Sequence, residues 1–184
     1  MKAKKLLKIN IGAGETKLKG FVNIDGQRST KPDLVLDIVK EKLPYKHGEV
    51  DVIYMLHCIE HIQEKFHLRI LLEFHRVLKM GGILVLAYPE FEKCVDRYLN
   101  NYKGQRDFYK MTIFGRQSWP GDFHVCPINS AEMRNLVQVA GFTQTKLIYE
   151  EAPDDAYALL SAKKGKRSIT YEDVLRKEMF NVHE

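Results

Sequence analysis

Five short, almost uninterrupted apolar runs constrain the fold of this chain more than any other feature. They lie in residues 6–12, 20–25, 33–38, 50–56 and 81–89. Runs of this kind, rich in Val, Ile and Leu, are typical of strands in a parallel sheet whose two faces are both covered. Between the fourth and fifth runs, apolar residues recur at helical spacing, and Gly81 is placed to end that helix. Strands that alternate with helices predict a doubly wound α/β fold.

The second half of the chain continues this pattern. An aromatic-rich stretch from Phe91 to Phe123 predicts one or two helices and a loop. Ser130 is the expected N-cap of a helix that Gly141 terminates. Runs in residues 143–151 and 156–164 then complete a mostly parallel, seven-stranded sheet. We therefore predict one domain over residues 1–164, followed by a helical tail over residues 165–184, where Thr170 and Asp173 resemble a capping box.

Composition excludes several classes of protein. The longest apolar runs are far shorter than the ~20 residues that cross a bilayer, and no signal peptide is recognisable, so we expect a cytoplasmic protein without a membrane span. Cys58, Cys94 and Cys126 are too widely spaced for a zinc cluster and suit a reducing compartment. The net charge of +5 comes with lysine clusters at both ends that contain no interleaved aromatic residues, which disfavours nucleic acid as a partner.

A glycine loop follows the first predicted strand. In "INIGAGE", Gly12 and Gly14 let the backbone turn sharply and approach a ligand. The dinucleotide-binding pattern needs a third glycine where Lys17 stands, and only 13 residues separate Gly12 from Asp25, against ~20 in that pattern. The first helix should therefore be truncated, and a pyrophosphate would find a poor site. These features disfavour a nicotinamide-dependent oxidoreductase.

Two aspartates point to a ligand that has a ribose but no pyrophosphate. Asp25, at the end of the second run, can accept hydrogen bonds from both ribose hydroxyls. Asp37, expected to end the third strand, could accept a hydrogen bond from an adenine amino group. In a doubly wound sheet both would lie at the carboxyl ends of the strands, where ligands bind.

Six segments together resemble a known family in their order and spacing. They are "INIGAG", "GFVNID", "LDIVKEKLPY", "VDVIYMLHCIEHI", "FHRVLKMGGILVLAYPE" and "MRNLVQVAGF". Over roughly residues 7–163 they are similar to class I S-adenosylmethionine-dependent methyltransferases of the type 11 family, in particular its small, short-loop members associated with surface-sugar pathways. The chain departs from many members at Asn10, where they carry an acidic residue, and at Met80, where they carry proline.

The resemblance implies that S-adenosylmethionine is the cofactor and that particular residues contact it. The methionine part would lie on Gly12, Ala13 and Gly14, the ribose on Asp25, and the adenine beside Asp37 and Ile38. Leu56 and His57 would lie near the sulfonium.

The string "HCIEH" also spells the H-x-x-E-H pattern of inverted zinc peptidases, through His57, Glu60 and His61. In the methyltransferase family this string lies at a strand-to-helix turn, which places His57 at a strand end and away from His61. No downstream segment offers a clear third ligand. We therefore predict no metal site.

The expected acceptor is a small molecule that bears a hydroxyl group, such as a sugar or nucleotide sugar, by family association alone. A hydroxyl acceptor benefits from a general base, for which His124 and His57 are the candidates, and Asp122 could orient the ring of His124. Residues 91–127 would cover the acceptor side. A non-catalytic module that binds the cofactor or a partner on the same fold stays an alternative, and the tail leaves a homodimer open.

Overall fold

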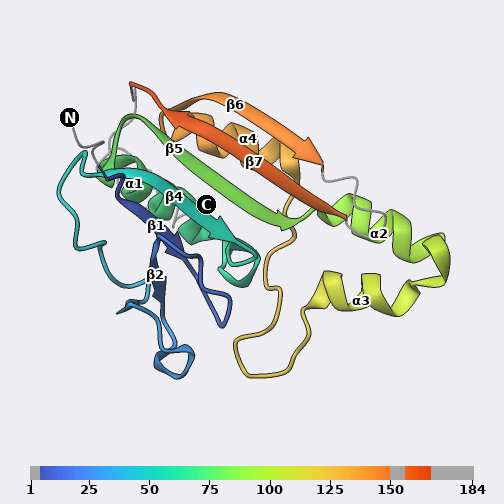
Figure 1. Cartoon of the computed structure of the whole chain (residues 1–184). Coiled ribbons are helices and arrows are strands. Elements are labelled where there is room, and N and C mark those ends of the chain that lie inside the picture. Colours follow the sequence, from blue (N-terminus) through green and yellow to red (C-terminus); the bar gives the residue numbers. More distant parts are fainter. Residues whose placement is uncertain (1–4, 150–155, 167–184) are drawn as a thin grey trace, which may run out of the picture.

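Seven strands form one sheet in the computed structural model of the protein, which describes residues 5–149 and 156–166 (Figure 1). The strand order is β3-β2-β1-β4-β5-β7-β6, and only β7 runs antiparallel to its neighbours. The strands are β1 (Lys8–Ile11), β2 (Val22–Asp25), β3 (Leu34–Val35), β4 (Val50–Leu56), β5 (Leu78–Pro89), β6 (Phe142–Tyr149) and β7 (Tyr157–Lys164). The mostly parallel, seven-stranded α/β fold expected from the sequence is confirmed.

The order of the strands reverses between β1 and β4. The chain moves outward from β1 to β2 and β3, and then returns to place β4 on the other side of β1. Such a switch point opens a crevice at the carboxyl ends of the two strands, where ligands bind in doubly wound sheets. Residues 12–21, which connect β1 to β2, contain no helix, so the first helix is truncated as expected.

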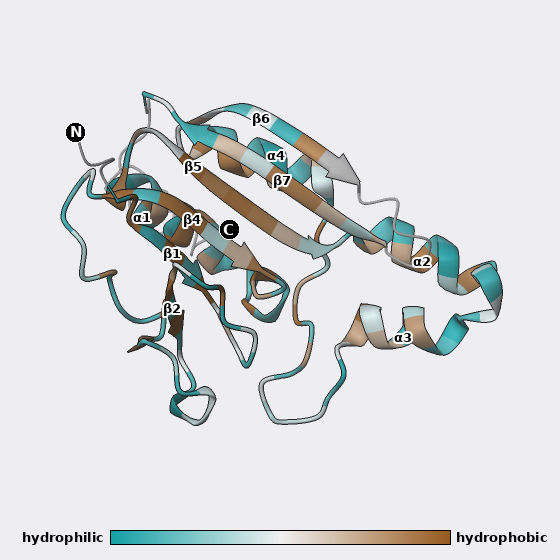
Figure 2. Cartoon of the chain, in the orientation of Figure 1, coloured by the Kyte–Doolittle hydropathy of each residue, from teal (hydrophilic) through white to brown (hydrophobic). Residues whose placement is uncertain are grey.

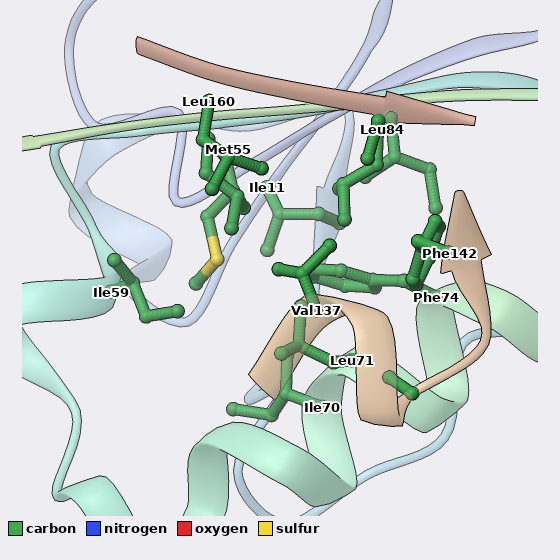
Figure 3. Close-up of a cluster of buried hydrophobic side chains, with 14 of the residues drawn as sticks. Ile11, Met55, Ile59, Ile70, Leu71, Phe74, Leu84, Val137, Phe142 and Leu160 are labelled. Atoms are coloured by element: carbon green, nitrogen blue, oxygen red, sulfur yellow. The ribbon is translucent and has the colours of Figure 1, made fainter. Parts of the chain in front are cut away.

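Helices α1 (His67–Val77) and α4 (Ser130–Val139) pack on one face of the sheet, behind it in the view of Figure 1. Figure 3 shows Leu71 and Phe74 of α1 beside Val137 of α4, beneath Ile11 of β1, all of them buried. Because such side chains leave water together, they supply the main driving force for folding. Figure 2 shows that β5, in the middle of the sheet, is also mostly apolar.

The helix between β4 and β5 ends earlier than predicted. It stops at Val77, and Leu78 already pairs with Val50 as the first residue of β5. Gly81 therefore lies inside the strand, with φ of +72°, close to the point where the register of β4 and β5 shifts. The prediction that Gly81 ends the helix is wrong, because pairing with β4 satisfies the backbone groups that the helix would otherwise have used.

Helix α4 is also capped by a different residue. The side chain of Asn129 accepts hydrogen bonds from the backbone N–H groups of Ala131 and Glu132, at 2.8 and 3.2 Å. Ser130 is the first residue of the helix and is buried, so the prediction of Ser130 as N-cap was one residue too late.

The chain beyond β5 forms a projection at the carboxyl edge of the sheet. It consists of α2 (Phe91–Leu99), a 3₁₀ turn η4 (Tyr102–Gly104), α3 (Arg106–Phe114) and a loop back to α4, as expected (Figure 1). Cys94 and Tyr109 are buried between α2 and α3 with Ala156. In the described part of the chain, no helix is long and apolar enough to cross a membrane. The predicted helix of the tail falls on residues 167–184, outside the described residues.

Candidate functional site

The loops that follow β1 and β4 pack tightly against each other at the switch point. Gly12 has φ of +67°, and a Cβ built there would lie 2.2 Å from the sulfur of Cys58. Gly14, with φ of +52°, has open space where a Cβ would stand. Burial raises the pKa of the Cys58 thiol, so this residue acts as a small apolar wall of the crevice. Its part in shaping the glycine loop has no signal in the sequence.

Asp25 lies beside this loop, at the carboxyl end of β2. One carboxylate oxygen accepts a hydrogen bond from the N–H of Gly14 and the other from the N–H of Gln27, both at 2.7 Å. The side chain is only 8% exposed. A carboxylate oxygen has a second lone pair, so Asp25 can hold the glycine loop and still accept hydrogen bonds from a ligand.

Asp37 occupies a different position from the one predicted. Strand β3 ends at Val35, and Asp37 begins the turn that follows. Its carboxylate accepts hydrogen bonds from the N–H of Val39 and from Lys40, both at 2.9 Å. Burial raises the pKa of the Asp37 carboxyl, but the hydrogen bonds from Lys40 and Val39 lower it by more, so the pKa lies below its ordinary value. The Cα of Asp37 nevertheless lies against Gly26, next to Asp25, so both aspartates belong to the same edge of the sheet.

The strand β4 ends at Leu56, on the other side of the crevice. His57 follows with φ of +50°, a left-handed conformation that is uncommon for a residue with a side chain. Its N–H donates to the carbonyl of Ala87 in β5, at 2.8 Å, which holds the turn against the sheet. The half-exposed imidazole makes an edge contact with the ring of Tyr157.

The 3₁₀ turn η2 (Ile59–His61) brings together two residues of the "HCIEH" string with His124. The imidazoles of His61 and His124 contact edge to face, with ring centroids 4.8 Å apart. The potential ligand atoms of Glu60, His61 and His124 all lie within 4.8 Å of one another. His57, the first histidine of the string, is not part of this group, so the three residues are not the ligand set of an inverted zinc peptidase.

His124 is held by the carbonyl of Thr112, which lies 2.8 Å from its Nδ1 atom. Asp122, which was expected to orient this ring, instead accepts hydrogen bonds from the hydroxyl and the N–H of Ser118. The expectation for Asp122 is therefore wrong, because the loop turns it toward its own backbone. Burial lowers the pKa of His124.

A cavity of about 240 Å³ lies between the sheet edge and the projection. Its walls come from η2, the end of β5, both projecting helices and the loop before α4: Glu60, Pro89, Phe91, Cys94, Thr112, Ile113, Phe114, His124, Val125, Cys126, Pro127 and Ile128. Trp119 and Phe123, two aromatic residues near the end of the aromatic-rich stretch, are exposed and do not line this cavity. The cavity thus has an apolar lining with an acidic side chain and an imidazole.

Comparison with known proteins agrees with this architecture. Residues 19–86 match the type 11 family model, described as a methyltransferase domain. The matched range runs from just before β2 into β5 and includes Asp25, Asp37 and the "HCIEH" turn, but leaves out the glycine loop and His124. No curated protein matches the chain.

Solved structures share the fold at low identity. An S-adenosylmethionine-dependent methyltransferase from Methanosarcina mazei is 18% identical with a TM-score of 0.61, covering 89% of this chain and 94% of that one. One from Archaeoglobus fulgidus is 14% identical with a TM-score of 0.61, covering 86% of each chain. A phosphoethanolamine N-methyltransferase from Haemonchus contortus, solved with S-adenosylhomocysteine, is 13% identical with a TM-score of 0.56, covering 90% of this chain and 50% of that one.

These findings together support a methyltransferase enzyme. They equally support S-adenosylmethionine as its cofactor. The geometry fits that cofactor: a glycine loop without a following helix suits a ligand that has no pyrophosphate, and Asp25 offers lone pairs to a ribose.

Proposed function

We propose that the protein transfers a methyl group from S-adenosylmethionine to a small, hydroxyl-bearing acceptor such as a sugar or nucleotide sugar. The observation that carries this proposal is the cavity of about 240 Å³ beside the switch-point crevice, with Glu60 and His124 in its wall. Sites for drug-sized ligands occupy about 300–1,000 Å³, so a smaller cavity suits a small acceptor. In this proposal, residues 91–127 cover the acceptor.

The cofactor would occupy the crevice between the loops after β1 and β4. Its methionine part lies along Gly12, Ala13 and Gly14, and its ribose hydroxyls donate to Asp25. The adenine lies toward Asp37 and Ile38, and the sulfonium lies toward Leu56 and His57. Two observations support this placement. Each carboxylate oxygen of Asp25 has a lone pair left for a ligand. Gly12 packs tightly on Cys58, so no side chain of the glycine loop fills the crevice at this point.

Methyl transfer is an in-line displacement in which the acceptor oxygen forms a bond to the methyl carbon as the carbon–sulfur bond breaks. The products are the methyl ether, S-adenosylhomocysteine and one proton. Holding the two reactants in line supplies much of the acceleration. His124, in the cavity wall, and His57, at the sheet end, are the side chains we propose to act on the acceptor hydroxyl and its proton.

One observation favours a second class of acceptor. Glu60 is 2% exposed, and neither of its carboxylate oxygens has a hydrogen-bond partner. A buried carboxylate that faces a cavity suits a protonated amine, which would be methylated on nitrogen after losing its proton. Amines therefore belong in the same panel of acceptors.

The test is methyl incorporation from labelled S-adenosylmethionine into a panel of sugars, nucleotide sugars and small amines. We expect transfer to a hydroxyl compound, and we expect His124→Ala to slow it by about 10²–10⁴-fold with little change in cofactor affinity. Tight cofactor binding without transfer to any acceptor would favour the non-catalytic module instead. Transfer to amines alone would show that the acceptor is an amine and not a hydroxyl compound.

A further inference from the structure

We propose that Glu60, His61 and His124 bind a divalent transition-metal ion in the wall of the cavity. The three side chains come from the turn after β4 and from the loop before α4, and their potential ligand atoms already lie within 4.8 Å of one another. Together they offer two imidazole nitrogens and one carboxylate.

Hydrogen bonds of the Nδ1 atoms leave the Nε2 atom of each histidine available as a metal ligand. Nδ1 of His61 lies 2.9 Å from the carbonyl oxygen of Phe123, and Nδ1 of His124 lies 2.8 Å from that of Thr112. A carbonyl only accepts, so each Nδ1 carries the proton and each Nε2 keeps its lone pair free. Histidine ligands of metal ions are commonly oriented in this way, by a hydrogen bond from the second ring nitrogen.

Glu60 supplies an independent observation that points to a cation. Its side chain is 2% exposed, lines the cavity, and has no hydrogen-bond partner on either oxygen. The nearest basic group is Nδ1 of His57, 3.6 Å from one of these oxygens, which is too far for a hydrogen bond. A buried carboxylate without a partner is unfavourable unless it is protonated or paired with a cation. A bound metal ion would satisfy it.

One backbone and one side-chain hydrogen bond hold the segments that carry the three residues together without any ion. The carbonyl of Glu60 accepts from the N–H of Val125 at 2.9 Å, so the loop that carries His124 is fastened directly to the turn that carries Glu60 and His61. The bond from His61 to the carbonyl of Phe123 fastens the same loop at a second point. The donor set is therefore formed by the fold itself.

The chemistry of the donors favours zinc or a similar ion over magnesium or calcium. Imidazole suits zinc, copper, iron and nickel, whereas magnesium and calcium prefer oxygen ligands. A tetrahedral zinc ion with bonds of about 2.0–2.1 Å holds its ligand atoms about 3.3 Å apart. The ligand atoms of the three side chains now lie up to 4.8 Å apart, so the most distant pair would have to approach by at most about 1.5 Å. Three protein ligands leave a fourth position open toward the cavity.

What the open position binds rests on the proposed function. An acceptor hydroxyl on the ion would lose its proton more easily, because the positive charge stabilises the oxyanion. His124 would then act on the hydroxyl through the ion, and His57, beside Glu60, would be left to receive the proton. The ion is neither oxidised nor consumed.

The test is a titration of the tag-free, chelator-treated protein with zinc chloride, followed by calorimetry. We expect one zinc ion per chain with micromolar or tighter affinity. His61→Ala, His124→Ala and Glu60→Gln should each weaken it by about 100-fold, while His47→Ala, which removes an exposed histidine outside the cluster, should leave it unchanged. Absence of binding to the wild type, or unchanged binding by the three variants, would overturn the proposal.

A second measurement needs no variant. Cobalt(II) bound by two imidazoles and a carboxylate absorbs visible light more strongly than the free ion, so the wild-type spectrum should show this band, and zinc should abolish it. A spectrum identical to that of free cobalt overturns the site. Cofactor affinity is measured on the same sample: cofactor binding without zinc binding rejects only the metal site, whereas zinc binding without methyl transfer rejects only the proposed reaction.

Discussion

At the scale of single residues, the crevice depends on Gly12. The position combines a positive φ with a neighbour, Cys58, that fills the space of a side chain. Gly14 shares the positive φ but has free space around it. Substitutions at the two glycines therefore distinguish the effect of backbone strain from the effect of steric overlap.

We expect Gly12→Ala to lower the melting temperature and to weaken cofactor binding, because its Cβ would overlap both the sulfur and the Cβ of Cys58. For stability, Gly14→Ala is the matched control, since in the free protein it introduces only left-handed strain of about 1–2 kcal/mol. Thermal melting of both variants checks the effect on stability, and calorimetry on Gly12→Ala checks cofactor binding. Equal effects of the two substitutions would show that the contact with Cys58 has no consequence.

Asp25→Ala should weaken binding of S-adenosylhomocysteine by about 1.5–3 kcal/mol, the value of hydrogen bonds to a charged group. Asp33→Ala is the control, because Asp33, like Asp25, accepts a hydrogen bond from a backbone N–H group, but its donor is Asn23 of β2 and not the glycine loop. Calorimetry distinguishes them. An unchanged dissociation constant for Asp25→Ala would remove this residue from the ribose.

At the scale of elements, the ends of the helices were the hardest features to predict. Helix α4 begins one residue earlier than its sequence indicated, since Asn129 caps it and the hydroxyl of Ser130 has no hydrogen-bond partner.

The turn between β4 and α1 depends on His67, whose Nε2 lies 3.1 Å from the carbonyl of Ile59 and 2.9 Å from that of Ile62.

Asn129→Ala should lower the free energy of unfolding by about 1 kcal/mol, because two N–H groups at the start of α4 lose their acceptor. Ser130→Ala should cost less, since its hydroxyl makes no hydrogen bond. Urea denaturation of both variants measures the difference. A larger loss for Ser130→Ala would restore Ser130 as the cap.

His67 should make stability depend on pH. Burial lowers its pKa in the folded protein below the ordinary 6.5, against the opposing bonds to the two carbonyls and the charges of Glu64 and Glu60. The unfolded chain therefore binds the proton first, and the free energy of unfolding should decrease as the pH falls below about 6.5. His67→Gln keeps a hydrogen-bond donor but does not titrate, so the free energy of unfolding of this variant should change less between pH 7 and 5 than that of the wild type. Urea denaturation at a series of pH values measures both curves. Parallel curves would contradict this.

At the scale of the whole molecule, the strand order and the short connections after β1 select the type of cofactor. The switch point offers a glycine loop and Asp25, but no helix at residues 12–21 to receive a pyrophosphate. The projection of α2 and α3 then covers the side of the sheet edge where the cavity lies.

S-adenosylmethionine should bind with micromolar affinity, and NADH should not bind. At about 100 times the dissociation constant, the cofactor should raise the free energy of unfolding by about 2.7 kcal/mol. Thermal melting with each ligand tests this, with S-adenosylhomocysteine as a positive control. Stabilisation by NADH alone would contradict the assignment of the crevice.

The amino-acid sequence by itself determined the parts of this protein that depend on local patterns. Apolar runs and helical spacing predicted the sheet and α1, because burial follows the period of each element. Gly12, Gly14 and Asp25 were recognisable because a tight turn and a strand end have characteristic residues. Tertiary structure decided where Gly81 lies, since pairing of Leu78 with Val50 ended the helix early.

Only the tertiary structure brought His124 to Glu60 and His61. The H-x-x-E-H string already contained two members of this cluster, but its third member depends on a backbone hydrogen bond from Val125 to Glu60, between segments far apart along the chain. No local preference of the sequence encodes such a contact. It follows from how α2, α3 and their loop return to the sheet, because that path decides which distant side chains share one buried wall.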